Sequence, residues 1–366
     1  MAGKRGNNEG SVYQRKDERW VGAYTAAGKR RYIYASTQEE AIKKLRATLT
    51  SLDKGEFVEP STMTVAQWLQ IWFNEYAKPR MRESTLAAHD GVIRGHLIPV
   101  LGKHKLQALR PEHIQAFINH QKHLAPATVI RQMGILKSAL KQARENQLIN
   151  RNPAEFAKLP KQEQKEIDAL TVEEQVTLLK MLPESTHGRA LRFALGTGLR
   201  ASELCGLRWR DVEAERIQIR QTCVLVNGRP VYGSPKTKAG RRAIPLNTKL
   251  TAILEQQKQA QRLERIKAGS AWVNEGFVFA TPIGTSLDRH NLARTYRGIL
   301  SKAGLKTRGL HTLRHSFATN WVQGGHDLRT LSELLGHSKV AFTMQTYVHS
   351  STAAKQAGMA YMEGLL

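Results

Sequence analysis

A short glycine-rich segment in the middle of the chain reads Gly196-Thr197-Gly198-Leu199-Arg200-Ala201-Ser202-Glu203-Leu204. Its glycines permit a tight turn, and the residues after them favour a helix that begins near Arg200, with Glu203 one turn later. An arginine at a helix start lies beside exposed backbone N–H groups, which is a favourable place for a phosphate. Taken alone, the segment would more often be a surface ion pair between Arg200 and Glu203.

A basic segment further along reads Ser234-Pro235-Lys236-Thr237-Lys238-Ala239-Gly240-Arg241-Arg242-Ala243-Ile244-Pro245-Leu246. Its pattern predicts two strands joined by a turn at Lys238–Gly240, which places Lys236 near the tip of a hairpin. A mobile loop lysine can enter a DNA groove and donate a proton. By itself, a basic hairpin is usually a simple DNA contact or a solvated loop.

A histidine and an arginine share one face of a predicted helix in His311-Thr312-Leu313-Arg314-His315-Ser316-Phe317-Ala318-Thr319. His311 and Arg314 stand at positions i and i+3, so they are neighbours on the helix surface. Leu313 and Phe317 form the opposite, buried face. A single histidine is more often a structural residue, but a histidine and an arginine aimed together indicate a site.

The last segment of interest is Leu334-Leu335-Gly336-His337-Ser338, followed by Met344-Gln345-Thr346-Tyr347-Val348-His349. Gly336 is expected to end a helix and to leave His337 at the start of the next stretch, with Tyr347 ten residues on. A tyrosine phenol has an ordinary pKa of about 10, so it needs nearby cations or a base before it can act as a nucleophile at neutral pH.

Together these side chains suit one chemical problem, the attack of a nucleophile on a phosphodiester. Negative charge then builds on the non-bridging phosphate oxygens, and guanidinium groups neutralise it through paired hydrogen bonds. No compact acidic cluster suited to Mg²⁺ is apparent, and the separated Cys205 and Cys223 with scattered histidines make a poor zinc site. We therefore expect no metal site.

The charge of the chain indicates a nucleic-acid partner. Its 366 residues include 56 lysines and arginines against 31 aspartates and glutamates, which gives a formal charge of +25 and a pI near 10.2. Such an excess is unfavourable by self-repulsion unless a polyanion neutralises it. A solvated basic surface is the weaker alternative, and charge alone does not separate DNA from RNA or an enzyme from a binder.

The remaining composition predicts a soluble protein of the cytoplasm. Mean hydropathy is −0.44, and no apolar run approaches the ~18–20 residues of a membrane helix. The basic N-terminus lacks the hydrophobic stretch of a secretory signal. With Cys205 and Cys223 alone, a disulfide framework is not expected, which fits a reducing compartment.

Composition and periodicity divide the chain into three domains, of which residues 1–56 form a small β-rich module. Strands are expected at Ser11–Arg15, Arg19–Tyr24 and Arg30–Tyr34, ahead of a helix from about Thr37. Basic side chains that alternate with aromatic ones suit a sheet laid in a DNA groove. Trp20, Tyr24 and Tyr34 are also candidates for the module's own core.

Residues 62–158 are predicted to form a helical bundle. An apolar stripe at helical spacing comprises Val65, Trp68, Leu69, Trp72 and Phe73. Further helices are expected at Ser84–Ile98, Pro111–His123 and Pro126–Gln147, the last with Ile130, Met133, Leu136 and Leu140 turned inward. The charged, proline-containing stretch 158–166 that follows is expected to be a flexible hinge.

Residues 168–366 are expected to mix helices with a small antiparallel sheet. A capping box at Thr171-Val172-Glu173-Glu174 begins the first helix, and Asn227-Gly228 is a strong hairpin turn. Strands are predicted at Ile217–Arg220, Thr222–Val226, Val231-Tyr232 and Ala243–Leu246. The fold class is therefore multidomain and mainly α.

The four segments, in this order, resemble the tyrosine recombinase (phage integrase) family. The family signature is an arginine in a G-x-R-x-x-E context, a β-hairpin lysine, H-x-x-R, a Gly-His pair and a tyrosine shortly after. The positions that match it are Arg200, Lys236, His311, Arg314, His337 and Tyr347. The first two domains are similar to the arm-binding module and the core-binding domain of integrases from temperate phages and conjugative transposons.

The resemblance implies a fold and a reaction. The helical bundle and the catalytic domain would clamp duplex DNA at a core site, and the N-terminal module would reach separate arm-type sites. Tyr347 would attack the scissile phosphate and give a 3′-phosphotyrosine with a free 5′-hydroxyl. Because one phosphodiester is exchanged for another, neither ATP nor a metal ion would be required.

The resemblance also implies a role for each matching residue. Arg200 and Arg314 would hold the non-bridging oxygens, and Lys236 would protonate the leaving oxygen. His311 and His337 would assist proton transfer and phosphate contact. Glu203, which is not part of the signature's reacting set, would orient its neighbours.

Partners and location follow from the same resemblance. It implies a homotetramer on DNA joined through an amphipathic C-terminal tail, Ala360–Leu366, which is equally suited to packing on its own chain. It leaves room for a DNA-bending or excision factor, and it implies the bacterial cytoplasm, at the nucleoid. Side chains expected to contact DNA are Arg15, Arg19, Lys29, Arg30, Arg31, Arg80, Arg82, Lys238, Arg241 and Arg242.

Two other functions remain open at this point. A type IB topoisomerase would use the same chemistry to nick and reseal one duplex, but it needs neither an N-terminal module nor a docking tail. A DNA-binding regulator descended from a recombinase would have no need of Tyr347. Integration or excision of a mobile element by strand exchange is the reading that uses every segment.

Overall fold

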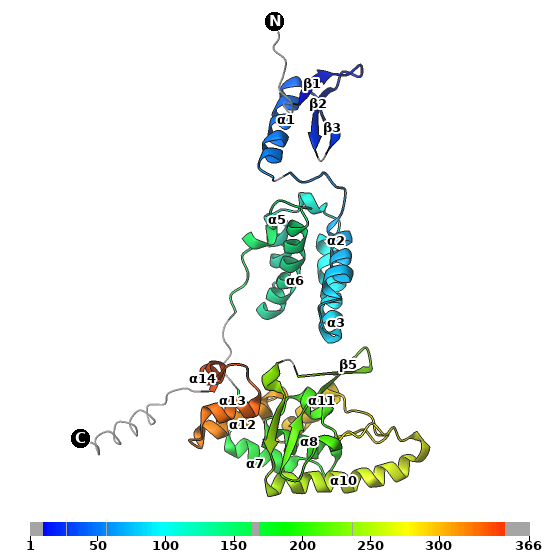
Figure 1. The fold of residues 1–366 in the computed structure, drawn as a ribbon. Coiled ribbons are helices and arrows are strands. Elements are labelled where there is room, and N and C mark those ends of the chain that lie inside the picture. Colours follow the sequence, from blue (N-terminus) through cyan, green and yellow to red (C-terminus); the bar gives the residue numbers. More distant parts are fainter. Residues whose placement is uncertain (1–9, 27, 56, 163–167, 236, 348–366) are drawn as a thin grey trace, which may run out of the picture. The chain divides into compact units, whose positions relative to one another are not determined.

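The structure, a computed structural model, describes residues 10–26, 28–55, 57–162, 168–235 and 237–347. The chain forms two compact units, Met1–Glu163 and Gln164–Leu366 (Figure 1). Their boundary falls within the stretch expected to be a hinge. The finer division at 1–56, 62–158 and 168–366 stays a prediction, although the first unit contains two separate hydrophobic clusters.

The first unit begins with the predicted β-rich module. Its elements are β1 (Ser11–Gln14), β2 (Trp20–Ala26), β3 (Lys29–Ala35) and α1 (Gln38–Asp53), and the strands pair antiparallel in the order β1-β2-β3. The Thr37 hydroxyl accepts a hydrogen bond from the Glu40 N–H and caps α1. The expected strands and helix are therefore confirmed to within a residue or two at their ends.

The two faces of this sheet differ. At Gly22 a Cβ would lie 3.4 Å from that of Leu45 on α1, so this face packs against the helix. Tyr24 lies on the same face, is 5% exposed and packs with Phe57. Tyr32 and Tyr34, at alternate positions of β3, remain 47% and 46% exposed. Tyr24 thus belongs to the module's core, whereas Tyr34 does not.

Helices and helical turns form the rest of the first unit. They are α2 (Val65–Ile71), the π-helical turn η1 (Trp72–Ala77), α3 (Glu83–Val92), the π-helical turn η2 (Ile93–Leu97), α4 (Ile98–Leu101), the 3₁₀ turn η3 (Leu106–Ala108), α5 (Pro111–His120), α6 (Pro126–Glu145) and the 3₁₀ turn η4 (Pro153–Phe156). Trp68 is buried and its indole N–H donates to the Ala139 carbonyl of α6 at 2.9 Å. On α6, Met133, Leu136 and Leu140 are buried as predicted, whereas Ile130 is only partly buried and its neighbour Val129 is buried.

The second unit is mainly helical, as expected. Its elements are α7 (Val172–Met181), α8 (Thr186–Thr197), α9 (Ala201–Gly206), η5 (Trp209–Asp211), β4 (Arg216–Ile219), β5 (Thr222–Val226), β6 (Arg229–Gly233), η6 (Lys238–Gly240), β7 (Arg242–Pro245), α10 (Thr248–Ala268), η7 (Gly269–Ala271), α11 (Arg289–Lys302), α12 (His311–Gln323), α13 (Leu328–Leu335) and α14 (Val340–Tyr347). The Thr171 capping box is confirmed, and so is the turn at Asn227-Gly228, where φ is 51° and 76°.

The predicted hairpin over Ser234–Leu246 is wrong in its pairing. β6 pairs with β5 and β7 pairs with β4, so two separate two-stranded ladders exist. The segment between β6 and β7 carries the chain from one ladder to the other through η6. Local strand propensity locates strands but does not choose their partners, because pairing depends on residues far away in sequence.

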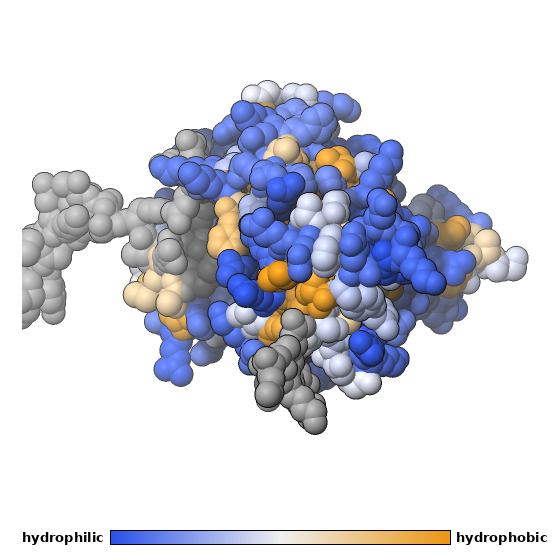
Figure 2. All heavy atoms as spheres, turned by 90° about the horizontal axis from the view of Figure 1, so that it is seen from above, coloured by the Kyte–Doolittle hydropathy of each residue, from blue (hydrophilic) through white to orange (hydrophobic). Residues whose placement is uncertain are grey.

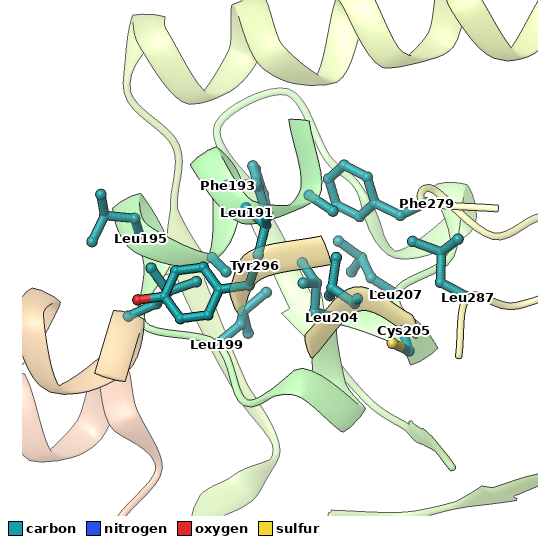
Figure 3. Packing of buried hydrophobic residues seen from close by; sticks show 14 of the residues in the cluster. Leu191, Phe193, Leu195, Leu199, Leu204, Cys205, Leu207, Phe279, Leu287 and Tyr296 are labelled. Carbon is teal, nitrogen blue, oxygen red and sulfur yellow. The ribbon is translucent and has the colours of Figure 1, made fainter. Parts of the chain in front are cut away.

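A hydrophobic core holds the helices of the second unit in place (Figure 3). Leu191 and Phe193 of α8, Leu204 of α9 and Tyr296 of α11 meet there, and the Phe193 and Phe279 rings lie 5.6 Å apart. This packing fixes the end of α8 and the start of α9, between which Arg200 lies.

The outside of the molecule is mostly hydrophilic on the face that Figure 2 shows. None of the helices in the described ranges is both long and apolar enough to cross a membrane.

Candidate active site

Arg200 is held at the N-terminus of α9. It follows Gly198, which ends α8 in the left-handed conformation with φ 65°. Its Nη1 donates to Glu203 Oε1 at 2.8 Å, and its Nη2 lies 3.5 Å from the Gly336 carbonyl. The side chain is still 36% exposed, so its remaining N–H groups can reach a ligand. The predicted turn and helix start are therefore confirmed.

Glu203 is a buried anion rather than half of a surface pair. It is 1% exposed, and its two oxygens accept hydrogen bonds from Arg200 and from Arg242. Burial opposes ionisation, but the hydrogen bonds and charges of Arg242 and Arg200 outweigh it and lower the pKa of Glu203 to about 2. The carboxylate therefore stays charged at neutral pH. Its depressed pKa stabilises the fold above pH 4.5, and this contribution is lost as pH falls toward 2.

Arg242, a predicted DNA contact, has its side chain turned into the second unit. Its side chain is 6% exposed and its Nη2 donates to Glu203 Oε2 at 2.9 Å. Its Nε donates to the Leu334 carbonyl at the end of α13. Through these partners Arg242 joins β7, α9 and α13 around the site.

Arg314 is the most buried cation of the site, with 1% of its surface exposed. Its Nη1 donates to the Gly198 carbonyl at 3.0 Å, and its Nη2 donates to the Leu335 carbonyl at 2.6 Å. Burial, and then the charge of Arg200, lower its pKa to about 9, so it stays charged at neutral pH. The two helix ends that precede Arg200 and His337 thus converge on one guanidinium.

The left-handed glycines at these helix ends are required sterically. A Cβ at Gly198 would lie 2.6 Å from Phe317 Cδ1, and a Cβ at Gly336 would lie 2.9 Å from the Ala239 carbonyl oxygen. Both residues have a positive φ that other residues rarely adopt. The glycines therefore let backbone carbonyls approach the arginines closely.

His337 begins the stretch after Gly336, as predicted. Its Nε2 lies 2.9 Å from Arg314 Nη2, which can only donate, so Nε2 accepts. Its Nδ1 then carries the proton and donates to Thr343 Oγ1 at 2.7 Å. Burial, Arg314 and Arg200 lower the pKa of His337 to about 4, in keeping with a neutral ring.

Tyr347 ends α14 with its ring packed among buried side chains. It is 8% exposed and belongs to a cluster with Ala318, Leu331 and Leu335. Its Oη lies 2.8 Å from Nδ1 of His315. Burial raises the pKa of Tyr347, and the charges of Arg314 and Arg200 act against that rise. The phenol therefore lies within electrostatic reach of both arginines.

His315 is the residue that sequence reasoning missed. It stands four positions after His311 on α12, and the two rings meet edge to face with centroids 4.6 Å apart. The i, i+4 spacing from His311 was the available signal. His311 itself lies in the first turn of α12 and is more exposed.

Apart from Glu203, Arg31 and Arg242, the predicted site residues fall into three groups. Arg200, His311, Arg314, His337 and Tyr347 lie together in the second unit, around the ends of α8, α12, α13 and α14. Lys236 lies outside the described residues, as does the side chain of Lys238. The predicted DNA contacts that are exposed at the surface are Arg15, Arg19, Lys29, Arg30, Arg80, Arg82 and Arg241.

Arg31 differs from the other predicted DNA contacts. Arg31 is half-buried and pairs with Glu59 at 2.5 Å, so part of its charge is already neutralised.

In the described ranges, no group of three or more histidine, cysteine, aspartate or glutamate side chains is arranged to hold a metal ion.

Known proteins are similar to this chain in sequence. Residues 168–354 match the phage integrase family, and residues 64–122 match the phage integrase N-terminal SAM-like domain. A tyrosine recombinase XerC-like protein of Caldanaerobacter subterraneus is 30% identical over 347 residues, 87% of this chain and 88% of that protein.

Solved structures extend the likeness to the fold. The integrase of transposon Tn1549, solved with transposon right-end DNA, has a TM-score of 0.70 at 22% identity and covers 82% of this chain and all of that one. A lambda integrase tetramer bound to a Holliday junction has a TM-score of 0.61 at 18% identity and covers 96% of this chain and 99% of that one.

Proposed function

This chain belongs to the phage integrase family, and from that premise we propose that it recombines DNA duplexes at specific sites through a 3′-phosphotyrosine on Tyr347. One observation carries the assignment: the Tyr347 hydroxyl lies in the same site as the guanidinium groups of Arg200 and Arg314, whose charges act on it. A non-catalytic DNA-binding regulator would have no use for a phenol in a cation-rich site.

Cleavage exchanges one phosphate ester for another. Tyr347 Oη attacks phosphorus, the Oη–P bond forms, and the bond from phosphorus to the 5′-oxygen breaks. Arg200 and Arg314 neutralise the non-bridging oxygens as charge builds on them. Because backbone carbonyls and Glu203 already fix both guanidinium groups, little reorganisation is needed when the phosphate arrives.

The other residues of the site have supporting roles. Lys236 protonates the 5′-oxygen as it leaves, and His337 assists the phosphate contact through Arg314, whose Nη2 donates to its Nε2. His311, more exposed at the start of α12, assists proton transfer near the DNA. Resealing runs the same steps backwards with a 5′-hydroxyl from the partner duplex.

DNA partners follow from the placement of exposed charge. Residues 62–158 and 168–366 bind a core site, and residues 1–56 bind a separate arm site. The open face of the N-terminal sheet supports this, because the Arg15 and Arg19 guanidinium groups lie 6.0 and 5.7 Å from the centre of the exposed Tyr34 ring. The lambda integrase tetramer supports assembly of this chain as a tetramer on DNA. The proposed place of action is the bacterial cytoplasm, at the nucleoid.

A joining assay tests the proposal. Two differently labelled duplexes, each carrying the crossover site, are expected to yield recombinant strands that contain both labels, without ATP or added metal. A type IB topoisomerase would instead relax supercoiled DNA that lacks the site and would join no strands between duplexes. Relaxation without joining would replace the recombinase assignment with that alternative.

The arm-binding role of residues 1–56 gives a second prediction. Deletion of these residues is expected to leave binding at the crossover site intact and to remove binding at distal sites. Arg30→Ala is expected to weaken distal binding alone, because Arg30 lies on the open sheet, while Lys43→Ala on the exposed side of α1 removes the same charge without effect. Gel-shift titrations on each DNA measure both, and unchanged distal binding by the deletion variant would contradict the assignment.

A further inference from the structure

The contact between His315 and Tyr347 serves none of the steps assigned above to the arginines, to Lys236 or to the other two histidines. Oη of Tyr347 lies 2.8 Å from Nδ1 of His315, a good hydrogen-bond distance. The two residues come from different helices, α12 and α14, and are 32 positions apart in sequence. The contact is therefore a product of the tertiary fold and not of local helix geometry.

The direction of this hydrogen bond follows from the surroundings. A buried hydroxyl needs an acceptor for its proton. Among the described residues, His315 Nδ1 is the acceptor that lies within hydrogen-bond distance of Oη. The phenol therefore donates, and the imidazole carries its own proton on Nε2. Burial and the charge of Arg314 lower the pKa of His315, so the neutral, accepting form prevails.

The neighbouring histidines are occupied differently. Both ring nitrogens of His337 already have partners, Arg314 and Thr343. His311 meets His315 edge to face, and in the described part of the chain it makes no hydrogen bond to Tyr347. His315 is thus the imidazole placed to receive the phenol proton.

We propose that His315 is the general base of DNA cleavage, an inference that rests on the proposed function of Tyr347. As the Oη–P bond forms, the hydroxyl proton passes to Nδ1, and the bond from phosphorus to the 5′-oxygen breaks. The leaving oxygen takes a separate proton from the acid. In resealing, the 5′-hydroxyl attacks and returns its proton to the same acid, and the protonated imidazole returns its proton to the departing phenolate.

The chemistry explains why a base is needed here. Burial raises the pKa of Tyr347, and this effect exceeds the opposing influence of Arg314 and Arg200. The arginines are committed to the phosphate and cannot accept a proton. An acceptor at 2.8 Å can take up the proton of this buried hydroxyl as the Oη–P bond forms.

The test separates proton transfer from positioning. His315→Asn places an amide oxygen near the position of Nδ1, where it can accept the hydrogen bond but cannot take up a proton. Single-turnover cleavage of a nicked crossover-site duplex is expected to slow about 100-fold, with DNA binding unchanged. His326→Asn is the matched control, because His326 is exposed and contacts Trp321 rather than Tyr347. Cleavage by His315→Asn at the wild-type rate would overturn the proposal.

A second substrate tests which proton His315 handles. Sulfur in place of the bridging 5′-oxygen leaves as a thiolate without protonation, since a thiol pKa is about 8.5. His315→Asn is expected to stay about 100-fold slower than wild type on this substrate, because the nucleophile still needs a base. Restoration to the wild-type rate would assign His315 to the leaving group and overturn the proposal.

These outcomes are distinct from failure of the proposed function. If the wild-type protein formed no covalent adduct, the role of Tyr347 itself would fail, whatever the variants did. The rate ratio between the oxygen and sulfur substrates is measured on one preparation. It therefore does not depend on what fraction of a variant is folded.

Discussion

Tyr347→Phe is expected to bind crossover-site DNA normally and to form no covalent adduct on a nicked substrate. The change removes Oη and leaves the ring that packs with Ala318, Leu331 and Leu335, so the fold is retained. Without the nucleophile, cleavage falls by at least about 10⁴-fold. A denaturing gel of protein mixed with labelled DNA measures adduct, and a gel shift measures binding.

Tyr361→Phe is the control for this prediction. Tyr361 is a second phenol near the C-terminus, outside the described residues, and its loss is expected to leave the adduct unchanged on the nicked substrate. An adduct that survived Tyr347→Phe but disappeared with Tyr361→Phe would show that Tyr361, and not Tyr347, is the nucleophile.

Arg200→Lys is expected to slow cleavage by roughly 10²–10³-fold while DNA binding stays close to normal. The guanidinium serves Glu203 through Nη1 and still offers N–H groups to a phosphate. A lysine keeps the positive charge but lacks the planar fork, so it cannot do both. Single-turnover cleavage of the nicked substrate measures the loss.

Arg216→Lys provides a matched comparison. Arg216 also pairs with a glutamate three positions away, Glu213 at 2.5 Å, but this pair is on the surface and more than half of the arginine side chain is exposed. The same substitution there is expected to leave cleavage unchanged, because surface ion pairs contribute little. Normal cleavage by Arg200→Lys would show that no guanidinium fork is needed at this position.

Local patterns were enough to predict most of the fold. The capping box at Thr171, the turn at Asn227-Gly228 and the helix end at Gly336 depend on neighbours in sequence, and the structure has each of them. Strand pairing depends on distant residues, and it is there that prediction failed. β7 lies beside β4 rather than β6, so the basic segment links two ladders.

The same distinction explains the site. Arg200 and Arg314 were found because each sits in a short local motif, and the structure brings them to one place. Arg242 was assigned to the surface because it stands in a basic run, and only the fold supplies the buried partner, Glu203, that draws it inside. His315 was missed because its partner, Tyr347, lies on another helix.

The covalent bond between protein and DNA can be located directly on the chain. Wild-type protein is trapped on a nicked duplex, digested with nuclease and protease, and the peptides are sequenced by mass spectrometry. A nucleotide remnant is expected on the side-chain oxygen of Tyr347. A remnant on any other side chain, or tight binding to the crossover site without any remnant, would contradict this expectation.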